Sequence, residues 1–330
     1  MDPKASIIIL AYKHEKSISA AIESVLAQQC NFTFEIIIGE DGSPDGTRHI
    51  CEEYARRFPN IIRLMPKAPN KGLVNNYFDC LEEARGEYVS DCAGDDIWVD
   101  TERLQRQSDW LDSHPDDVAV LSNWLVNKGG ICQNSCDIPE MHIFLRSMTG
   151  HEMQRLLINT KSAFPLFSAM LYRRGVLSAV LKKSPQLLRN SKWGMEDFPA
   201  LMALGENGNF GFLPLAACQY NINPEGLSNN TDLLRQFDFY LKALDGVLAL
   251  APAYGFGYED ARENLSHKAQ FLAGSLLMLK YDTERSSKLR ELCLPFRSIL
   301  NLTTKFYLVA INNPLAWAVV SWLKKLKAKC

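Results

Sequence analysis

The sequence predicts an α/β fold in which a mostly parallel central sheet carries helices on both faces. Two observations support this class. Short apolar runs, typical of strands buried on both faces, alternate with segments of helical periodicity through residues 1–125. Strands that alternate with helices form right-handed βαβ units, and such units build a parallel sheet. We therefore expect residues 1–125 to form a doubly wound half and residues 126–230 a second half of one domain. Residues 231–330 are expected to form a helical C-terminal extension.

Each expected element of the first half follows from a local pattern. Strands are expected at Ser6–Leu10, Phe34–Gly39, Ile61–Met65 and within Gly86–Trp98, where apolar runs are bounded by turn residues. Helices are expected at Lys16–Gln28, Ile50–Phe58 and Leu73–Ala84, where apolar residues recur on one helical face. Pro59 closes the second helix.

The second half is less regular. Residues 126–165 are expected to form a variable connection or lid, because glycines and a proline punctuate them. The further expected elements are a strand at Phe167–Tyr172, short helices at Val176–Leu181 and Pro199–Leu204, and a strand pair at Phe210–Leu215 and Ala217–Ile222. Long helices are expected at Leu233–Ala251 and Ala261–Leu279.

Composition excludes several classes of protein. With 36 Lys and Arg against 38 Asp and Glu, the chain lacks the basic field that a nucleic-acid partner would need. The nine cysteines form no C-x-x-C pair, and Cys132 and Cys136 have no second pair or His cluster beside them to complete a zinc site. Scattered cysteines are typical of a reducing cytosol. The first apolar run, Ile7–Leu10, is too short for a signal-peptide core, so we expect a cytoplasmic protein.

The stretch Gly86–Trp98 places two adjacent acids, Asp95 and Asp96, in a turn after a strand. Ligands of α/β sheets bind beyond the carboxyl ends of strands, so one interpretation is a divalent cation with a phosphate attached to it. The other is a solvated turn that caps the next helix. Neither G-x-G-x-x-G after the first strand nor G-x-x-x-x-G-K-S/T occurs. Phosphate must therefore be held in another way, and a metal on Asp95 and Asp96 is the candidate.

Five ordered motifs carry a resemblance to a known family. They are S-I-I-I-L-A-Y-K-H-E, E-I-I-I-G-E-D-G-S-P-D-G-T-R, N-K-G-L-V-N-N, G-E-Y-V-S-D-C-A-G-D-D-I-W and M-E-D-F-P-A-L. Their order and spacing resemble family 2 glycosyltransferases of the GT-A fold, of the type that builds bacterial surface polysaccharides. The resemblance is strong over roughly residues 4–125 and weaker over 160–230. It implies transfer of a sugar from a nucleotide-diphosphate donor with inversion, aided by Mn²⁺ or Mg²⁺.

The resemblance assigns the donor site to strand ends. Tyr12 and Asp41 would hold the nucleoside, most often uridine, and Gly72 of the N-K-G motif would contribute to donor binding. From the residues alone, the favoured interpretation is that Tyr12 is an aromatic at the edge of the core and Asp41 a turn residue before Gly42, and the resemblance reverses this preference.

The metal site follows in the same way. Asp96 would be the main metal ligand, and Asp95 a second ligand nearer the ribose or donor sugar. The family's first acid is replaced by Ala93. Trp98 would wall the site, with burial at the start of a helix as the alternative.

Glu196 and Asp197 match the family's acidic motif before the helix of the second half. By resemblance, Asp197 is the general base that removes the proton of the acceptor hydroxyl, and Glu196 orients it, or the roles are exchanged. The structural alternative is an acid that caps the helix containing Pro199.

Two positions depart from the family. Asn221 and Asn223 replace an Arg and a His that many relatives carry, so a non-catalytic nucleotide-sugar-binding or scaffolding homologue is the alternative function. A nucleotidyltransferase is a weaker third hypothesis, because A-Y-K-H-E replaces the Gly-rich basic loop that it would need.

The segment Phe306–Leu323 is largely apolar, is interrupted at Asn312–Pro314 and runs into K-K-L-K-A-K. Three interpretations are open: a membrane-surface segment at the inner face of the cell membrane, a helix packed on the catalytic domain, or a dimer contact. The first would suit a polyprenyl-linked glycan acceptor rather than a free glycan.

Overall fold

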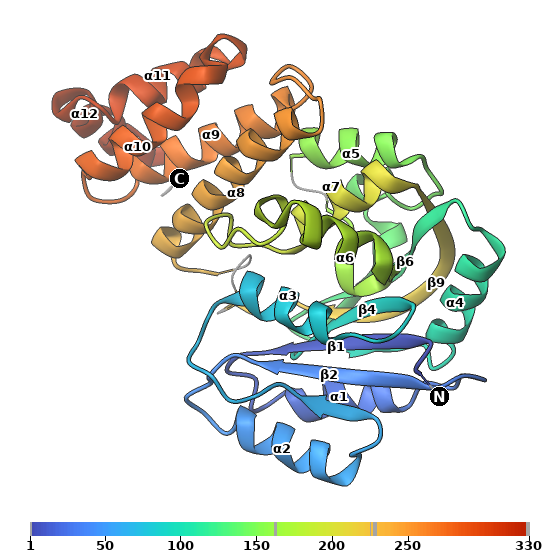
Figure 1. The fold of residues 1–330 in the computed structure, drawn as a ribbon. Coiled ribbons are helices and arrows are strands. Elements are labelled where there is room, and N and C mark those ends of the chain that lie inside the picture. Colours follow the sequence, from blue (N-terminus) through green and yellow to red (C-terminus); the bar gives the residue numbers. More distant parts are fainter. Residues whose placement is uncertain (1, 162–163, 225, 227–229, 328–330) are drawn as a thin grey trace. The chain divides into compact units, whose positions relative to one another are not determined.

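The structure of the protein is a computed structural model, which describes residues 2–161, 164–224, 226 and 230–327. The described strands form a nine-stranded sheet with the order β3-β2-β1-β4-β8-β6-β9-β5, and β7 pairs with β6 (Figure 1). The strands are β1 Ala5–Ala11, β2 Phe34–Glu40, β3 Ile62–Leu64, β4 Tyr88–Ala93, β5 Ile97–Trp98, β6 Asp117–Lys128, β7 Ile131–Asn134, β8 Met170–Arg173 and β9 Asn209–Asn221.

The first half is the expected doubly wound arrangement. Strands β1, β2, β3 and β4 are mutually parallel where they pair, and β1 is completely buried in the middle between β2 and β4, apart from a partly exposed Leu10. Helices α1 (Ile18–Leu26) and α2 (Thr47–Arg57) lie on one face of these strands and α3 (Leu73–Glu83) on the other (Figure 1). The expected strands and helices of this half are therefore confirmed, with ends that differ by a few residues.

The second half extends the sheet with mixed directions. Strand β8 is antiparallel to both β4 and β6, whereas β6 and β9 are parallel. Helix α4 (Arg103–Ser113) ends the first half and was not expected from the sequence. The helices of the second half are α5 Gly150–Asn159, α6 Arg174–Lys183 and α7 Asp197–Asn207, with short 3₁₀ turns η1 Ser135–Asp137, η2 Pro139–Met141, η3 Phe167–Ala169 and η4 Pro185–Leu187. The carboxyl ends of β1, β2 and β4 meet at one edge of the sheet, where the predicted donor site lies.

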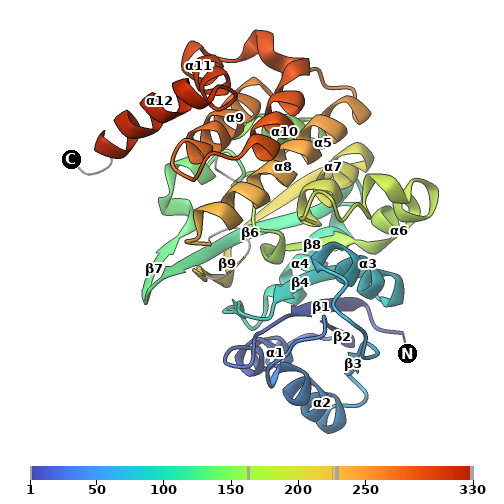
Figure 2. The ribbon, with the colours of Figure 1, turned by 90° about the vertical axis from the view of Figure 1, so that its left-hand side faces the viewer.

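Residues 126–165 are more ordered than the sequence suggested. β6 and β7 form an antiparallel hairpin that closes at Gly129 and Gly130, both with positive φ (Figure 2). A capping box starts α5: Thr149 Oγ1 accepts from the N–H of Glu152, and Glu152 Oε2 accepts from the N–H of Thr149. The expectation of an irregular connection over residues 126–165 was therefore wrong. The T-x-x-E pattern of Thr149 and Glu152 is typical of a helix start and is present in the sequence.

The expected strand pair after Phe210 was also wrong, because β9 is one continuous strand. Its pairing with β6 shifts register where Ser122 lies opposite Leu213 and Asn123 opposite Ala216. Pro214 falls in this irregularity, where its missing N–H costs no ladder hydrogen bond. The sequence pattern around Pro214 indicates the end of a strand, whereas the structure has a bulge within one strand there.

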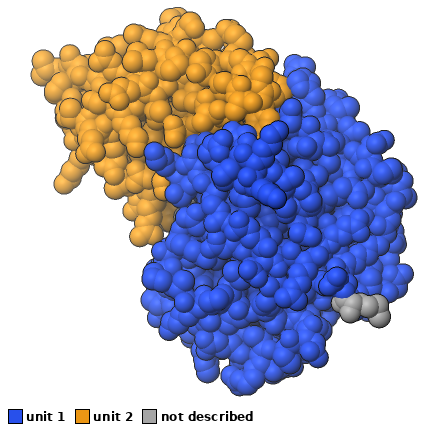
Figure 3. Space-filling view, viewed as in Figure 1, with its two compact units in different colours: residues 1–156, 163–222 blue, residues 157–162, 223–330 orange. Residues whose placement is uncertain are grey.

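The chain divides into two compact units, coloured in Figure 3. Unit 1 comprises residues 1–156 and 163–222 and contains the sheet; unit 2 comprises residues 157–162 and 223–330. The division falls at residue 222, whereas the sequence placed it at 230. Unit 2 is helical, with α8 Leu233–Ala253, α9 Arg262–Leu276, α10 Thr283–Cys293, the 3₁₀ segment η5 Leu294–Ile299, α11 Leu302–Ala310 and α12 Pro314–Lys327.

Candidate active site

The ends of β1 and β2 lie next to each other. The N–H of Asp41 donates to the carbonyl of Ala11 at 3.0 Å, so the residue after β2 is bonded to the last residue of β1. Tyr12 follows directly and is 41% exposed, with the Lys13 ammonium 5.2 Å from the centre of its ring. One face of Tyr12 thus contacts a cation, and the ring remains accessible to a ligand. Its predicted stacking on a base stays a prediction.

Asp41 is buried and organises the loop that contains Gly72. Its two carboxylate oxygens accept from the N–H groups of Lys71 at 2.8 Å and Gly72 at 2.9 Å. Gly72 has φ +83°, a conformation that glycine adopts without strain. The structure therefore brings together two residues that the resemblance placed at the donor site. Asp41 keeps lone pairs for a ribose or base, since each carboxylate oxygen can accept more than one hydrogen bond.

The two acids after β4 lie in different environments. Asp96 is 2% exposed, whereas the Asp95 side chain is about a quarter exposed, with its Oδ2 3.8 Å from Nε2 of His14. Burial, reinforced by the charge of Asp95, raises the pKa of Asp96 well above its ordinary value. A buried carboxyl with a second carboxyl beside it is stabilised in its ionised form by a cation.

Asn221 joins these acids to β9 and is a residue whose role the sequence did not indicate. Its N–H donates to Asp96 Oδ1 at 3.0 Å, and its side-chain amide donates to the carbonyl of Asp95 at 2.6 Å. Its side-chain oxygen Oδ1 accepts from the side-chain amides of Asn127 and Gln219, both at 2.8 Å. The side chain and backbone of Asn221 are thus held in place by four hydrogen bonds within unit 1. The sequence holds no local pattern that predicts this contact, because Asn221 and Asp96 are 125 positions apart and meet only in the folded chain.

The donor set around Asp95 and Asp96 fits a hard divalent cation only in part. Among the described residues, no group of three or more His, Cys, Asp or Glu side chains forms a complete metal cage. Mg²⁺ and Mn²⁺ are often held by one or two carboxylates together with waters and phosphate oxygens, so an incomplete protein cage suits a cation that arrives with a diphosphate. In that arrangement Asp96 would hold the metal, with Asp95 as the more accessible second ligand.

Trp98 is 3% exposed and packs in the interior. The Arg103 guanidinium lies 3.8 Å from the centre of its ring, and its Nε1–H donates to the carbonyl of Asp91. The sequence left two interpretations of Trp98 open: a wall of the donor site, or a buried aromatic at the start of a helix. These contacts favour the buried aromatic.

Asp91 is a second residue that the sequence reasoning missed. It lies within β4, is 7% exposed, and neither of its carboxylate oxygens has a hydrogen-bond partner among the residues that the structure describes. Burial raises its pKa well above the ordinary value; the positive charge of Arg103 opposes this shift and the negative charge of Asp197 adds to it. The sequence did contain a signal for Asp91, namely an acid in the middle of a buried strand. Acids are almost never fully buried without a partner, so such a residue is a candidate for function.

Replacing Asp91 by Asn should therefore change the pH dependence of stability. Because the pKa of this acid is raised in the folded state, its ionisation opposes folding, and the penalty grows as pH rises above about 4, where an unfolded Asp ionises. We expect Asp91→Asn to raise the free energy of unfolding at pH 7 by on the order of 1–3 kcal/mol, with the gain vanishing toward pH 4. Denaturant titrations of both proteins across this pH range measure it. An equal gain in the free energy of unfolding at pH 7 and at pH 4 would contradict the raised pKa of Asp91.

Glu196 and Asp197 lie at the start of α7. Asp197 is the first helical residue, and its Oδ1 accepts from the N–H of Phe198 at 2.7 Å. Burial of the carboxyl raises the pKa of Asp197 to about 6, and burial together with the neighbouring Asp197 raises that of Glu196 well above its ordinary value. Two adjacent carboxyls do not ionise independently, so one proton remains on the pair to higher pH. The arrangement leaves Asp197 ionised and moderately basic near neutral pH.

Two buried tyrosines lie within the electrostatic range of this pair and of Asp91 in β4. The hydroxyls of Tyr77 and Tyr172 are hydrogen-bonded to each other, and both rings are completely buried. Burial raises the pKa of both tyrosines, and the charges of Asp91 and Glu196 add to the shift. The acidic groups of β4 and α7 therefore act on one another in the interior of unit 1.

A family model described as Glycosyl transferase family 2 matches residues 6–181, which is more than half of the chain. The chain belongs to glycosyltransferase family 2. It is accordingly a transferase, as the five sequence motifs implied. The matched span contains Tyr12, Asp41, Gly72 and the acidic pair, and it ends before Glu196 and Asp197.

Relatives of this family 2 transferase are similar over part of their length. An uncharacterized protein of Mycobacterium tuberculosis is 40% identical over 111 residues, which are 34% of this chain and 32% of that protein. The putative glycosyltransferase EpsE of Bacillus subtilis is 35% identical over 124 residues, 38% of this chain and 44% of EpsE. Poly(ribitol-phosphate) beta-N-acetylglucosaminyltransferase TarS of Staphylococcus aureus is 26% identical over 240 residues, 72% of this chain and 39% of TarS. The match to the mycobacterial protein thus spans about a third of its length.

Solved structures share the fold. The S. aureus TarS structure in complex with UDP-GlcNAc has a TM-score of 0.61 at 20% identity, covering 97% of this chain and 89% of that one. The mannosyltransferase PcManGT from Pyrobaculum calidifontis, in complex with GDP-Man and Mn²⁺, has a TM-score of 0.56 at 17% identity, with coverages of 98% and 88%. The GT-A fold expected from the sequence is confirmed, and the match includes the C-terminal helices.

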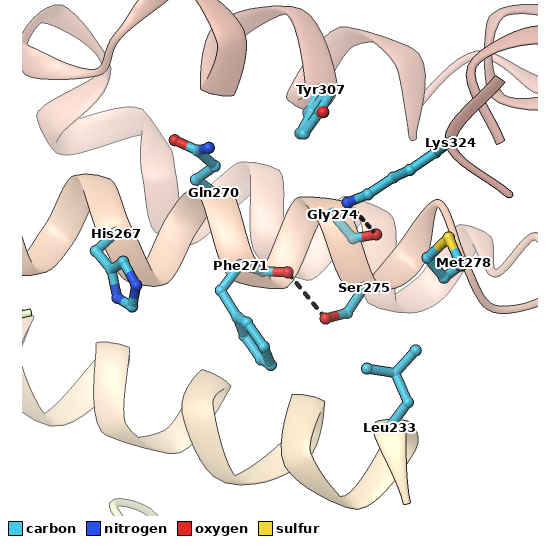
Figure 4. A pocket seen from close by; sticks show the side chains of 9 residues that line it. All are labelled: Leu233, His267, Gln270, Phe271, Gly274, Ser275, Met278, Tyr307 and Lys324. Atoms are coloured by element: carbon cyan, nitrogen blue, oxygen red, sulfur yellow. Dashed lines mark hydrogen bonds between the residues drawn. The ribbon is translucent and has the colours of Figure 1, made fainter. Parts of the chain in front are cut away.

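A cavity of about 400 Å³ lies within unit 2 and is lined by none of the predicted site residues (Figure 4). Its walls come from α8, α9, α11 and α12. Lys324 points into it, donates to the carbonyl of Gly274 at 3.1 Å, and lies 5.1 Å from the ring centre of Tyr307. Lys324 thus faces the interior of unit 2.

Proposed function

We propose that this protein transfers a sugar from a nucleoside-diphosphate donor, with a UDP-sugar as the first candidate, to a hydroxyl group of a glycan or polyprenyl-linked glycan, with inversion at the anomeric carbon. The observation that carries the proposal is the carboxyl of Asp197, raised in pKa to about 6 at the start of α7. Such a base is ionised at neutral pH and still accepts a proton readily. The nucleotide-sugar complexes of TarS and PcManGT, which share the fold, support the choice of donor.

In the proposed reaction each group has one task. Tyr12, Asp41 and the Gly72 loop bind the nucleoside at the ends of β1 and β2. Asp96, assisted by Asp95, would hold Mn²⁺ or Mg²⁺, which when bound neutralises charge on the leaving diphosphate. Asp197 takes the proton of the acceptor hydroxyl as the oxygen bonds to the anomeric carbon and the diphosphate leaves. Glu196, whose pKa is raised well above its ordinary value by burial and by Asp197, orients the acceptor or the base.

Location and product belong to the same proposal. The minor teichoic acid biosynthesis protein GgaB of Bacillus subtilis and the poly(ribitol-phosphate) beta-N-acetylglucosaminyltransferase TarS are similar to this chain over part of its length, which supports a role in building a bacterial surface polysaccharide. The cysteines Cys30, Cys51, Cys80, Cys92, Cys132, Cys136, Cys218 and Cys293 carry free thiols. These thiols support a cytoplasmic location.

A panel of nucleotide sugars, each with Mn²⁺, tests the donor. The matching donor should raise the free energy of unfolding by about 2.7 kcal/mol at a hundredfold excess over its Kd, read as a rise in Tm. It should also be hydrolysed slowly without acceptor, releasing the nucleoside diphosphate. If no nucleotide sugar stabilises the protein with or without Mn²⁺, the proposed donor class is wrong.

The alternative is a non-catalytic nucleotide-sugar-binding or scaffolding homologue. Asn221 favours it, because the Arg that would grip phosphate in relatives is replaced by an amide committed to the protein's own hydrogen bonds. Stabilisation by a donor without any hydrolysis or transfer would support this alternative.

A further inference from the structure

Helix α12 turns its apolar residues toward solvent. Leu315 is 81% exposed and Trp322 62% exposed, values that are unusual for large apolar side chains. The exposed apolar residues recur at helical spacing along one face: Leu315, Val319, Trp322, Leu323 and Leu326. The opposite face packs on the protein and is the more polar one: Ser321 is 3% exposed and Trp317 donates to the carbonyl of Leu276. This is the reverse of a surface helix of a soluble domain, which buries its apolar stripe.

Helix α11 repeats the pattern. Leu302, Phe306 and Val309 recur at helical spacing and are between 55% and 85% exposed. Thr304, on the other face, is completely buried, with its N–H donating to Asn301. Helices α11 and α12 pack against each other within unit 2 and are joined by a short turn, so their exposed apolar residues lie on neighbouring helices. Figure 2 shows the two helices side by side. Most of the largest exposed apolar side chains of the described chain lie on these two helices.

Charge in the same region has one sign. Residues 292–330 contain no Asp or Glu and six cationic residues: Arg297, Lys305, Lys324, Lys325, Lys327 and Lys329. The rest of the chain holds the remaining 30 Lys and Arg against all 38 Asp and Glu. The positive charge is therefore concentrated in the stretch of sequence that contains α11 and α12, in a protein that is otherwise acidic. Of the side chains that the structure describes, Arg297 is exposed and Lys305 partly exposed, whereas Lys324 faces the cavity.

We propose that the outer face of α11 and α12, formed by Leu302, Phe306, Val309, Leu315, Val319, Trp322, Leu323 and Leu326, lies flat on an anionic lipid membrane. Apolar side chains with a Trp enter the boundary between headgroups and acyl chains, and cationic residues bind the anionic headgroups. No described helix has the length and apolar character needed to cross a bilayer. α12 has 14 residues and is therefore about 21 Å long.

A second copy of the chain fits this face less well. A twofold contact would bring the cationic residues of one copy against those of the other, without a single acid from residues 292–330 to pair with them. Lipid headgroups supply the missing negative charge. Membrane docking is independent of the transfer reaction proposed above, so either proposal can fail alone.

Vesicle flotation of the full chain tests the proposal without donor or acceptor. We expect the protein to bind vesicles that contain phosphatidylglycerol, to bind pure phosphatidylcholine vesicles at least about tenfold more weakly, and to lose affinity as salt rises. Trp322 emission should shift to shorter wavelength on binding. Equal binding to both kinds of vesicle, or no binding, overturns the proposal.

Paired variants locate the surface. Phe306→Ser with Trp322→Ser removes exposed side chains only, so the fold should be kept and binding to anionic vesicles should fall at least about tenfold. Arg297→Glu with Lys305→Glu should have a similar effect that depends on salt. Ile131→Ser removes an equally exposed apolar residue of β7, 76% exposed, and should leave binding unchanged. If the first pair instead abolishes a concentration-dependent dimer while vesicle binding persists, the face is a subunit interface and the proposal is wrong.

Discussion

Asp197→Asn should reduce transfer by about 100- to 10,000-fold while leaving donor affinity nearly unchanged, because an amide cannot take the proton of the acceptor hydroxyl. The amide oxygen of Asn can still accept from the N–H of Phe198, and the raised pKa of Asp197 means that its charge opposes folding near neutral pH, so the fold should be kept. Initial rates of sugar transfer, together with calorimetry of donor binding, measure the two effects. Transfer at the unmodified rate would remove Asp197 as the base.

The pH profile adds an independent measurement. Burial raises the pKa of Asp197 to about 6, so the base is ionised above this pH and protonated below it. We expect kcat/KM of the unmodified enzyme to be level near pH 7 and to fall about tenfold per pH unit below pH 6.

Glu196→Gln is the matched control for this prediction. Burial and the neighbouring Asp197 raise the pKa of Glu196 well above its ordinary value, so this acid holds its proton to higher pH than a free Glu. The Gln variant should thus keep a large part of the activity and the same acid limb. The reverse result, with Glu196→Gln inactive and Asp197→Asn active, would exchange the two roles.

Asp96→Asn should remove the metal dependence of nucleotide binding. The amide oxygen can still accept from the N–H of Asn221, so the turn should be kept, whereas the charge that would hold the cation is lost. We expect affinity for a nucleoside diphosphate in Mn²⁺ to fall at least about tenfold, or 1.4 kcal/mol, toward the value measured in a chelator. Calorimetry with and without Mn²⁺ measures this difference.

The exposed Asp116, which precedes β6, provides a control of equal chemistry. Asp116→Asn should leave both the affinity and its metal dependence unchanged. If the affinity for the nucleotide is unchanged by Mn²⁺ and by the Asp96→Asn substitution, the two acids after β4 form only a turn.

The sequence determined the first half of the fold because its signals are local. Alternating apolar runs and helical periodicity placed β1, β2, β3 and β4 within a few residues of their observed ends. The motifs also placed Tyr12 and Asp41 correctly at neighbouring strand ends, since parallel strands present their carboxyl ends at one edge.

Only the tertiary structure decided which side chains act together. Asn221 reaches the acidic pair because β9 pairs with β5, a contact between residues more than a hundred positions apart. Asp91 lies in a cluster with acids of α7 that no local pattern connects to it. Helices α11 and α12 are apolar in sequence, and periodicity predicts that such a stripe is buried. Packing against the rest of unit 2 uses their other face, and it leaves the apolar stripe exposed.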